Sequence, residues 1–269
     1  EIEINNNKIK DTNAVDLEIM LKKVIKYVMS GLQETNYPIG ISEINNIQIE
    51  YYNLIKGKDY VISKIEPKDF IGPSSSTLQL SNISVKNEDS DIVNIRDNYT
   101  VTDKADGERK LLFISSTGKI YLIITNINIQ FTGSYTKNKE LYNTLIDGEH
   151  ILYNKLNEFI NLYAAFDIYF IKNNDVRKLE FVPNEGDETI KNKFRLPLLT
   201  NVIMSLDSKL IGTNKLSPIR IELKKFYQTN RSNNIFKACS NIINNRYEYE
   251  TDGMIFTPKN LGVGINSLD

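Results

Sequence analysis

The sequence is poor in the residues that build many catalytic sites. It contains one histidine, His150, and one cysteine, Cys239, in 269 residues. A Cys/His zinc site needs several such ligands, so that class of site is excluded and a serine–histidine triad is disfavoured. Any chemistry must depend on Lys, Arg, Asp, Glu and the backbone. A lone cysteine forms no internal disulfide, which indicates a reducing compartment.

Long apolar runs and a strong charge bias are also missing. Runs such as 121–125 and 163–171 fall far short of the roughly 20 residues that span a membrane, and no secretory signal is visible. The 33 Lys+Arg nearly balance 34 Asp+Glu, which excludes a globally basic nucleic-acid coat but not a local basic cleft. With 41% hydrophobic residues, the composition is typical of a soluble globular protein with one large domain or two smaller ones.

Periodicity predicts helices first and then mostly strands. Apolar residues that recur every three or four positions predict an amphipathic helix over 14–34, capped by Asp11 or Thr12. Residues 47–55 favour a strand or a short helix, 66–76 a loop and 184–187 a charged linker. Further strands are predicted at 1–4, 99–104, 110–115, 119–131, 144–152, 162–171, 220–227 and 251–257, and helices at 196–206 and 233–244. From residue 99 onward the order is strands first and then helices mixed with strands, which predicts an α+β fold with antiparallel sheets.

The pair Asp-Gly occurs at 106–107, 147–148 and 252–253. Between β-type residues it is a strong hairpin signal, so each pair alone favours a simple turn. Each pair also lies among charged residues, and its glycine permits a close approach of the backbone to a phosphate. The three pairs therefore indicate either structural turns or parts of one site.

Together these segments supply a lysine nucleophile, an arginine for phosphate and carboxylates for a metal. A lysine amine attacks only when unprotonated, and its reference pKa is about 10.4. An adjacent arginine, a bound cation and desolvation all lower that pKa. Oxygen ligands suit Mg²⁺ or Mn²⁺ bridging the phosphates of a nucleotide. The sequence thus supports phosphoryl chemistry centred on a lysine.

Four segments in order resemble the motifs of the covalent nucleotidyltransferases, which comprise DNA ligases, RNA ligases and mRNA capping guanylyltransferases. Lys-x-Asp-Gly-x-Arg at 104–109 resembles motif I, 147–149 motif III, 163–168 motif IIIa and 252–256 motif IV. The motif IV form, Asp-Gly before two apolar residues and Phe-Thr-Pro, is closer to capping enzymes than to ligases. Segments 70–73, 77–79, 101–107, 175–177 and 195–197 are similar to capping enzymes of large DNA viruses. The resemblance covers roughly residues 70–264.

The resemblance implies an mRNA guanylyltransferase. Lys104 would attack GTP, and the lysyl-N-GMP would pass GMP to the 5′-diphosphate end of RNA. The implied catalytic residue is Lys104, the nucleotide-binding residues are Arg109, Glu149, Phe166 and Tyr163, and the ligands of Mg²⁺ or Mn²⁺ are Glu149 and Asp252. An ATP-dependent polynucleotide ligase that uses the same lysine with AMP, and a non-catalytic RNA- or subunit-binding fragment, remain alternatives.

Several of these residues also have structural interpretations. Arg109 could form a surface salt bridge with Glu108 or Asp106, the carboxylates could be solvated, and Phe166 or Tyr163 could belong to the core. Asp167 is expected to support the metal through water. His150 and Cys239 are expected to be structural, and the lysine pairs 22–23 and 224–225 to be solvated.

The resemblance also implies an organisation. We expect 1–65 to be the remnant of a preceding domain, an RNA triphosphatase in such viral enzymes, with a linking helix. Residues 66–269 would form the nucleotidyltransferase domain, with an ATP-grasp-like nucleotide cleft, flanking helices and no motif V or OB domain. That truncation predicts weak GTP binding and slow guanylylation. Triphosphatase, OB and methyltransferase domains would share the polypeptide, located in the host-cell cytoplasm, viral factory or virion without a membrane.

Overall fold

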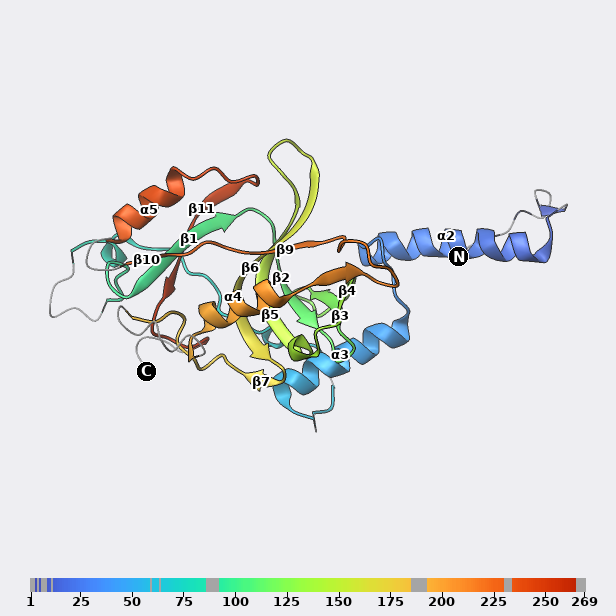
Figure 1. Ribbon diagram of the computed structural model, residues 1–269, viewed down its shortest axis with the longest axis horizontal. Helices are drawn as coiled ribbons and strands as arrows, with labels where there is room; N and C mark the ends of the chain where they lie inside the picture. The colour runs from blue at the N-terminus through green and yellow to red at the C-terminus, as the bar shows by residue number, and fades with distance from the viewer. Residues whose placement is uncertain are drawn as a thin grey trace.

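The computed structural model describes residues 3, 5, 9–10, 12–58, 60–62, 64–85, 92–184, 193–229 and 234–264. Its body contains two β-sheets with helices packed against them, and one helix projects away from this body (Figure 1). The strand pairs are antiparallel apart from one parallel pair, β6 with β9. The predicted α+β class is therefore confirmed. No helix among the described residues is long and apolar enough to cross a membrane.

The projecting helix is α2, Ala14–Gln33. Its cap is Asn13, whose side chain accepts a hydrogen bond from the Asp16 amide, in place of the predicted Asp11 or Thr12. None of its residues is buried, and Leu32 is 79% exposed. The helix predicted over 14–34 is thus confirmed, but its apolar stripe does not enter the core.

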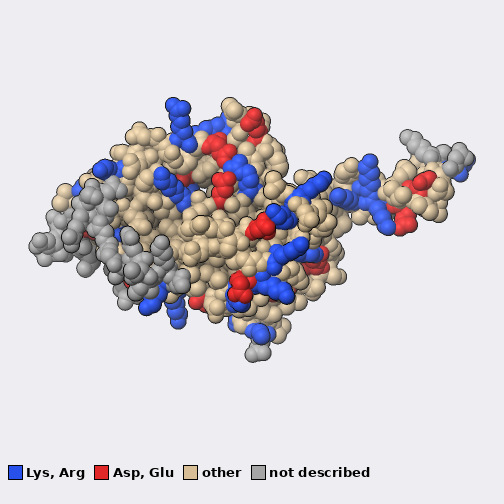
Figure 2. Space-filling view, viewed as in Figure 1, with Lys and Arg blue, Asp and Glu red and all other residues tan. Residues whose placement is uncertain are grey.

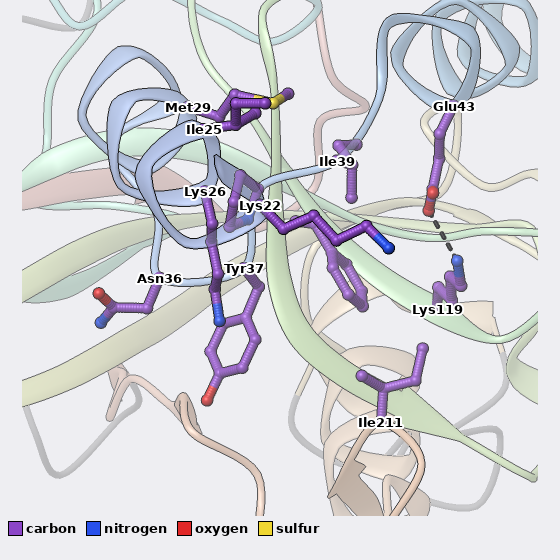
Figure 3. A pocket seen from close by; sticks show the side chains of 12 residues that line it. Lys22, Ile25, Lys26, Met29, Asn36, Tyr37, Ile39, Glu43, Lys119 and Ile211 are labelled. Atoms are coloured by element: carbon purple, nitrogen blue, oxygen red, sulfur yellow. Dashed lines mark hydrogen bonds and ion pairs between the residues drawn. The ribbon is translucent and has the colours of Figure 1, made fainter. Parts of the chain in front are cut away.

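A cavity of about 490 Å³ lies where α2 meets the large sheet (Figure 3). Tyr37 and Phe131 contribute to its apolar wall, and the ion pair between Lys119 and Glu43, 2.7 Å long, lies at its edge. The Tyr37 ring packs directly on Gly133, where a Cβ atom would come within 2.5 Å of the ring. These contacts connect the end of α2 to the sheet.

The large sheet has the strand order β7-β6-β5-β2-β3-β4-β8, and β9 also pairs with β6. Its strands are β2 Glu108–Ile114, β3 Lys119–Ile123, β4 Ile129–Thr136, β5 Thr144–Tyr153, β6 Phe159–Ile171, β7 Asn174–Asp175, β8 Ser208–Leu210 and β9 Arg220–Leu223. The single strand predicted over 119–131 is wrong, because the chain turns between β3 and β4. Ile127 adopts a φ of 61° in that turn, and its amide bonds the Ile124 carbonyl.

Helices cover both faces of the large sheet. Helix α3, Ile41–Lys56, packs Ile47, Tyr51 and Tyr52 against one face, where Leu111 and Phe113 are fully buried. Helix α4, Arg195–Ser205, covers the other face. The stretch 47–55, predicted as a strand or a helix, therefore belongs to a helix. Short 3₁₀ helices occur at η1 Pro67–Asp69, η2 Leu80–Asn82 and η3 Lys139–Leu141.

The small sheet has the order β10-β1-β11 and comprises β1 Tyr99–Ala105, β10 Tyr227–Gln228 and β11 Thr251–Pro258. Helix α5, Ile235–Ile243, packs Ile235, Ala238 and Ile242 against it, with Cys239 partly buried in the same cluster. The strand predicted over 220–227 is divided between β9 of the large sheet and β10 of this one.

None of the three Asp-Gly pairs is a hairpin turn, so that interpretation is wrong. The first connects β1 of the small sheet to β2 of the large sheet, and these strands belong to different sheets. The second lies inside β5 and the third inside β11. Gly148 serves close packing and Gly253 lies at a strand irregularity, as described below. The predicted strand at 1–4, apart from Glu3, and the linker at 185–187 lie outside the described residues.

Candidate functional site

A β-bulge places Lys104 opposite Asp252. In the pairing of β1 with β11, Asp103 faces Met254 and Ala105 faces Thr251, so Asp252 and Gly253 together oppose Lys104. Gly253 has a φ of 146°, a conformation that L side chains rarely adopt. Bulges redirect side chains and are frequent beside active sites. Here the Lys104 ammonium donates to Asp252 Oδ2 at 2.5 Å.

This ion pair favours the protonated form of Lys104. Its hydrogen bond to Asp252 raises the pKa of Lys104, and the same bond lowers the pKa of Asp252. Both side chains are about half exposed, at 44% and 53%. The sequence predicts a lowered lysine pKa, and the shift here is opposite because Lys104 pairs with a carboxylate. A free amine requires that this pair first be broken.

Glu149 lies on β5, half-buried beside the same cluster of charges. Burial raises the pKa of Glu149 to about 7, and Lys224 is the cation that most opposes this rise. Glu149 in turn contributes to the raised pKa of Lys104. The two carboxylates proposed from the sequence, Glu149 and Asp252, therefore border one site with the lysine.

Lys224 is a member of this site that the sequence analysis missed. Its Nζ donates to the Asp103 carbonyl at 2.6 Å and lies 3.0 Å from Asp103 Oδ2. Lys224 is 5% exposed, whereas the adjacent Lys225 is exposed. The prediction of two solvated lysines is therefore wrong for Lys224. No local pattern distinguishes the pair, because the partner that buries Lys224 is 121 positions away in sequence.

Arg109 pairs with Asp147 instead of with Glu108 or Asp106. Its Nε and Nη2 donate to the two Asp147 oxygens at 3.0 and 2.6 Å, and Nη1 donates to the Pro73 carbonyl at 2.8 Å. Asp147 is fully buried, and the Tyr169 hydroxyl also donates to it. The Nε and Nη2 side of the guanidinium is thus fixed by Asp147. Its Nη1 hydrogen bond to the Pro73 carbonyl is exposed to solvent, so a ligand oxygen can replace that carbonyl.

The two aromatic residues proposed for base stacking differ in accessibility. Tyr163 is fully buried, and its hydroxyl bonds the backbone of Lys110 and Leu112. Its ring packs on Gly148, where a Cβ would come within 2.5 Å of it, so the second Asp-Gly pair needs glycine for packing. Phe166 is half-buried, and its ring centre lies 6.0 Å from the Arg109 guanidinium carbon. Of the two rings, only Phe166 presents surface at the site.

Two other polar residues form structural contacts. Asp167 makes a bidentate pair with Arg195, with distances of 2.9 and 3.2 Å, although the sequence analysis expected it to support a metal through water. This pair is buried, and Arg195 also donates to the Leu261 carbonyl at 3.0 Å. His150 bonds Asn161 at 2.8 Å on the opposite face of β5 from Glu149, consistent with a structural role.

A divalent cation such as Mg²⁺ takes oxygen ligands from a protein. Among the described residues, no three His, Cys, Asp or Glu side chains gather as a metal site. Mg²⁺ commonly takes only one or two carboxylates and completes its shell with water and substrate phosphates. Glu149 and Asp252 both raise the pKa of Lys104, and they are two carboxylates that would supply such ligands.

Figure 2 shows Lys and Arg interspersed with Asp and Glu on the visible face of the described residues. This mixture agrees with the near-balance of charges in the sequence and with the absence of a globally basic surface. The cations described at the site, Lys104, Arg109 and Lys224, are each paired with an aspartate.

A family model and a known protein that match this chain both belong to mRNA capping enzymes. The model of the mRNA capping enzyme catalytic domain matches residues 3–265. A probable mRNA-capping enzyme of Acanthamoeba polyphaga mimivirus is 27% identical over 236 residues, which is 86% of this chain and 18% of that protein. The chain thus spans less than a fifth of this relative.

Solved structures with partial similarity include two DNA ligases. A mycobacterial DNA ligase D complexed with ATP and MES aligns with a TM-score of 0.37 at 10% identity, covering 61% of this chain and 50% of that one. A Lig E DNA ligase aligns with a TM-score of 0.35 at 12% identity, covering 70% and 64%. From the family match over residues 3–265, the chain belongs to the catalytic domain family of mRNA capping enzymes.

Proposed function

We propose that this chain is an mRNA guanylyltransferase that transfers GMP from GTP, through a lysyl-N-GMP intermediate on Lys104, to the 5′-diphosphate end of RNA. The bulge that sets Lys104 against Asp252 supports this function most directly, because it brings the lysine that would attack GTP beside a carboxylate that would bind the metal. Membership of the capping enzyme family supports the nature of the transferred group.

The transfer proceeds in two displacements at phosphorus. The Lys104 amine forms a bond to the α-phosphorus of GTP while the bond from that phosphorus to the α–β bridging oxygen breaks, and pyrophosphate departs with those electrons. The lysine nitrogen releases one proton to solvent to give the phosphoamide. An oxygen of the RNA diphosphate then attacks the same phosphorus, and the lysine nitrogen leaves and regains a proton. Covalent catalysis of this kind divides one difficult step into two.

Lys104 must lose its proton before the first displacement. Its raised pKa depends mainly on the hydrogen bond to Asp252, so withdrawal of that carboxylate favours the neutral amine. Glu149 and Asp252 would hold Mg²⁺ or Mn²⁺, which when bound supplies neutralising charge at the phosphates. Asp252 would therefore change partner when nucleotide and metal enter, and this change couples metal binding to activation of the lysine.

Arg109 and Phe166 would bind the nucleotide. The solvent-exposed bond of Arg109 Nη1 to the Pro73 carbonyl can be exchanged for a ribose or phosphate oxygen. Asp147 meanwhile keeps the guanidinium in place through two bonds. Phe166 offers a ring for stacking on the base, a contact worth about 1–3 kcal/mol that tolerates any base. The proposal also includes RNA as the acceptor of GMP and further domains in the same polypeptide. It places the protein in the host-cell cytoplasm, a viral factory or a virion.

The test is incubation of the purified chain with α-labelled GTP or ATP and Mg²⁺ or Mn²⁺, followed by a denaturing gel. A covalent band from GTP supports the guanylyltransferase, and a band from ATP supports the polynucleotide ligase. Absence of both bands at saturating nucleotide and long incubation times would favour the non-catalytic binding fragment and would contradict the proposal.

A further inference from the structure

The residue before the nucleophile is held by two elements distant in sequence. Asp103 points to the opposite side of β1 from Lys104 and is 1% exposed. Its Oδ2 accepts a hydrogen bond from the Tyr249 hydroxyl at 3.2 Å and forms an ion pair with Lys224 Nζ at 3.0 Å. Its carbonyl also accepts from Lys224 Nζ at 2.6 Å. Both the side chain and the backbone of Asp103 are therefore fixed.

This attachment lies beside the irregularity in the pairing of β1 with β11. The β1–β11 register shifts between Asp103 and Ala105, so Lys104 is the residue at the irregularity. A bulge disrupts the local ladder, and the backbone there is held less firmly by strand pairing. Tyr249 comes two residues before β11 begins at Thr251, and Lys224 directly follows β9. Asp103 thus connects β1 to the start of β11 and to the large sheet.

We propose that Tyr249 is a positioning residue for the nucleophile: its hydroxyl holds the Asp103 carboxylate and, with Lys224, fixes the direction in which β1 presents Lys104. The inference rests on the proposed function, because guanylylation of Lys104 is its main readout. Tyr249 does not contact the nucleotide in this account. It acts through Asp103, so its loss should lower the rate constant for attack by Lys104 and leave the affinity for GTP unchanged.

The ring and the hydroxyl of Tyr249 have separable roles. The ring packs in a small apolar cluster with Ala105, Ile151 and Leu162, which Tyr249→Phe would preserve. Only the hydroxyl bonds Asp103. Tyr247 provides a matched control, because its ring lies 5.6 Å from that of Tyr249 and its hydroxyl forms no hydrogen bond to Asp103 in the described structure.

The kinetic experiment compares the wild-type chain, Tyr249→Phe and Tyr247→Phe in single-turnover guanylylation. The Tyr249→Phe rate constant at saturating GTP should fall about tenfold, the scale of one hydrogen bond to a charged group. The GTP concentration for half-maximal rate should stay within about twofold, as should both parameters of Tyr247→Phe. In an Asp103→Ala background, which removes the acceptor of the Tyr249 hydrogen bond, Tyr249→Phe should lower the rate further by less than about twofold, because the contact is already lost.

Amide hydrogen exchange supplies a readout that needs no nucleotide. Exchange at residues 103–106 should be faster by about tenfold in Tyr249→Phe and unchanged in Tyr247→Phe, because loss of the contact lets the bulge open locally. A wild-type chain that forms no adduct contradicts the proposed function, while exchange still decides the inference. Equal exchange and equal rates in Tyr249→Phe and the wild type would overturn the inference, as would a change confined to GTP affinity.

Discussion

The Arg109–Asp147 pair allows a quantitative prediction about stability. Arg109→Met would remove both bonds to a carboxylate that is fully buried. Breaking a buried ion pair from one side costs about 3–5 kcal/mol, because the remaining charge stays buried without its partner. For a chain of this size that corresponds to a fall of roughly 6–20 °C in the unfolding midpoint. Thermal unfolding followed by circular dichroism measures it.

The loss of stability in Arg109→Met should also depend on pH, and the pKa of Asp147 determines the direction of that dependence. Burial raises the pKa of Asp147, and Arg109 opposes the rise. A raised carboxyl pKa means that the folded state takes up protons more readily, so stability falls as pH rises through that pKa. Loss of Arg109 raises the pKa of Asp147 further. The deficit of Arg109→Met should therefore be larger at about pH 8 than at about pH 5.

Arg177 offers a closely matched control. Both arginine side chains are 29% exposed, and Arg177 also makes a bidentate pair, with Asp175. Asp175 is 39% exposed, however, so water can replace the arginine. Arg177→Met should cost less than about 1 kcal/mol. Equal losses in the two variants, or an Arg109→Met deficit that grows towards acid, would refute the reasoning about the buried charge.

Three further predictions concern glycine packing, a raised pKa and the metal. Burial raises the pKa of Glu149 from 4.5 to about 7, so the wild type loses stability as pH rises between these values. The stability of Glu149→Gln relative to the wild type should therefore increase over this pH range and stay constant above about pH 7. Thermal melts of both proteins across this range measure the difference. Gly148→Ala should cost about 1–3 kcal/mol against the Tyr163 ring, whereas Gly31→Ala, with open space around it, should add up to about 1 kcal/mol to helix α2; denaturant titrations compare them. Glu149→Ala and Asp252→Ala should each reduce labelling and raise the Mn²⁺ concentration required, and an unchanged metal titration in both variants would show that neither carboxylate holds the metal.

Elements with a regular local pattern could be predicted from the sequence. The helix at 14–34 and the strands near 99–104, 144–152 and 251–257 follow from hydrophobic period alone, and the structure confirms them within a few residues. The division of 119–131 could not be predicted in this way. Its turn contains Ile127, which is apolar and fully buried although its φ is 61°. Isoleucine is a residue typical of strands, so its presence in this turn leads the sequence pattern to predict one continuous strand.

The site residues show the limit of local reasoning more clearly. Motif order predicted Lys104, Glu149 and Asp252 as site residues. The structure pairs Lys104 with Asp252 and places Glu149 near enough to raise the pKa of Lys104. The Asp-Gly pairs predicted turns, but β1 pairs with β11, about 150 positions later, instead of with β2. Burial of Lys224 depends on this same long-range arrangement. Side chains whose partners come from distant strands have no signature in their own neighbourhood.

The central claim is that Lys104 carries the nucleotide. The most direct measurement is to incubate the chain with GTP and a divalent cation, digest it and locate the added GMP by mass spectrometry. We predict GMP on Lys104, in a bond that survives alkali and breaks in acid, as a phosphoamide does. We also predict no adduct in Lys104→Ala, with its melting temperature unchanged because this side chain is 44% exposed. GMP on another residue, or labelling that persists in Lys104→Ala, would contradict the account.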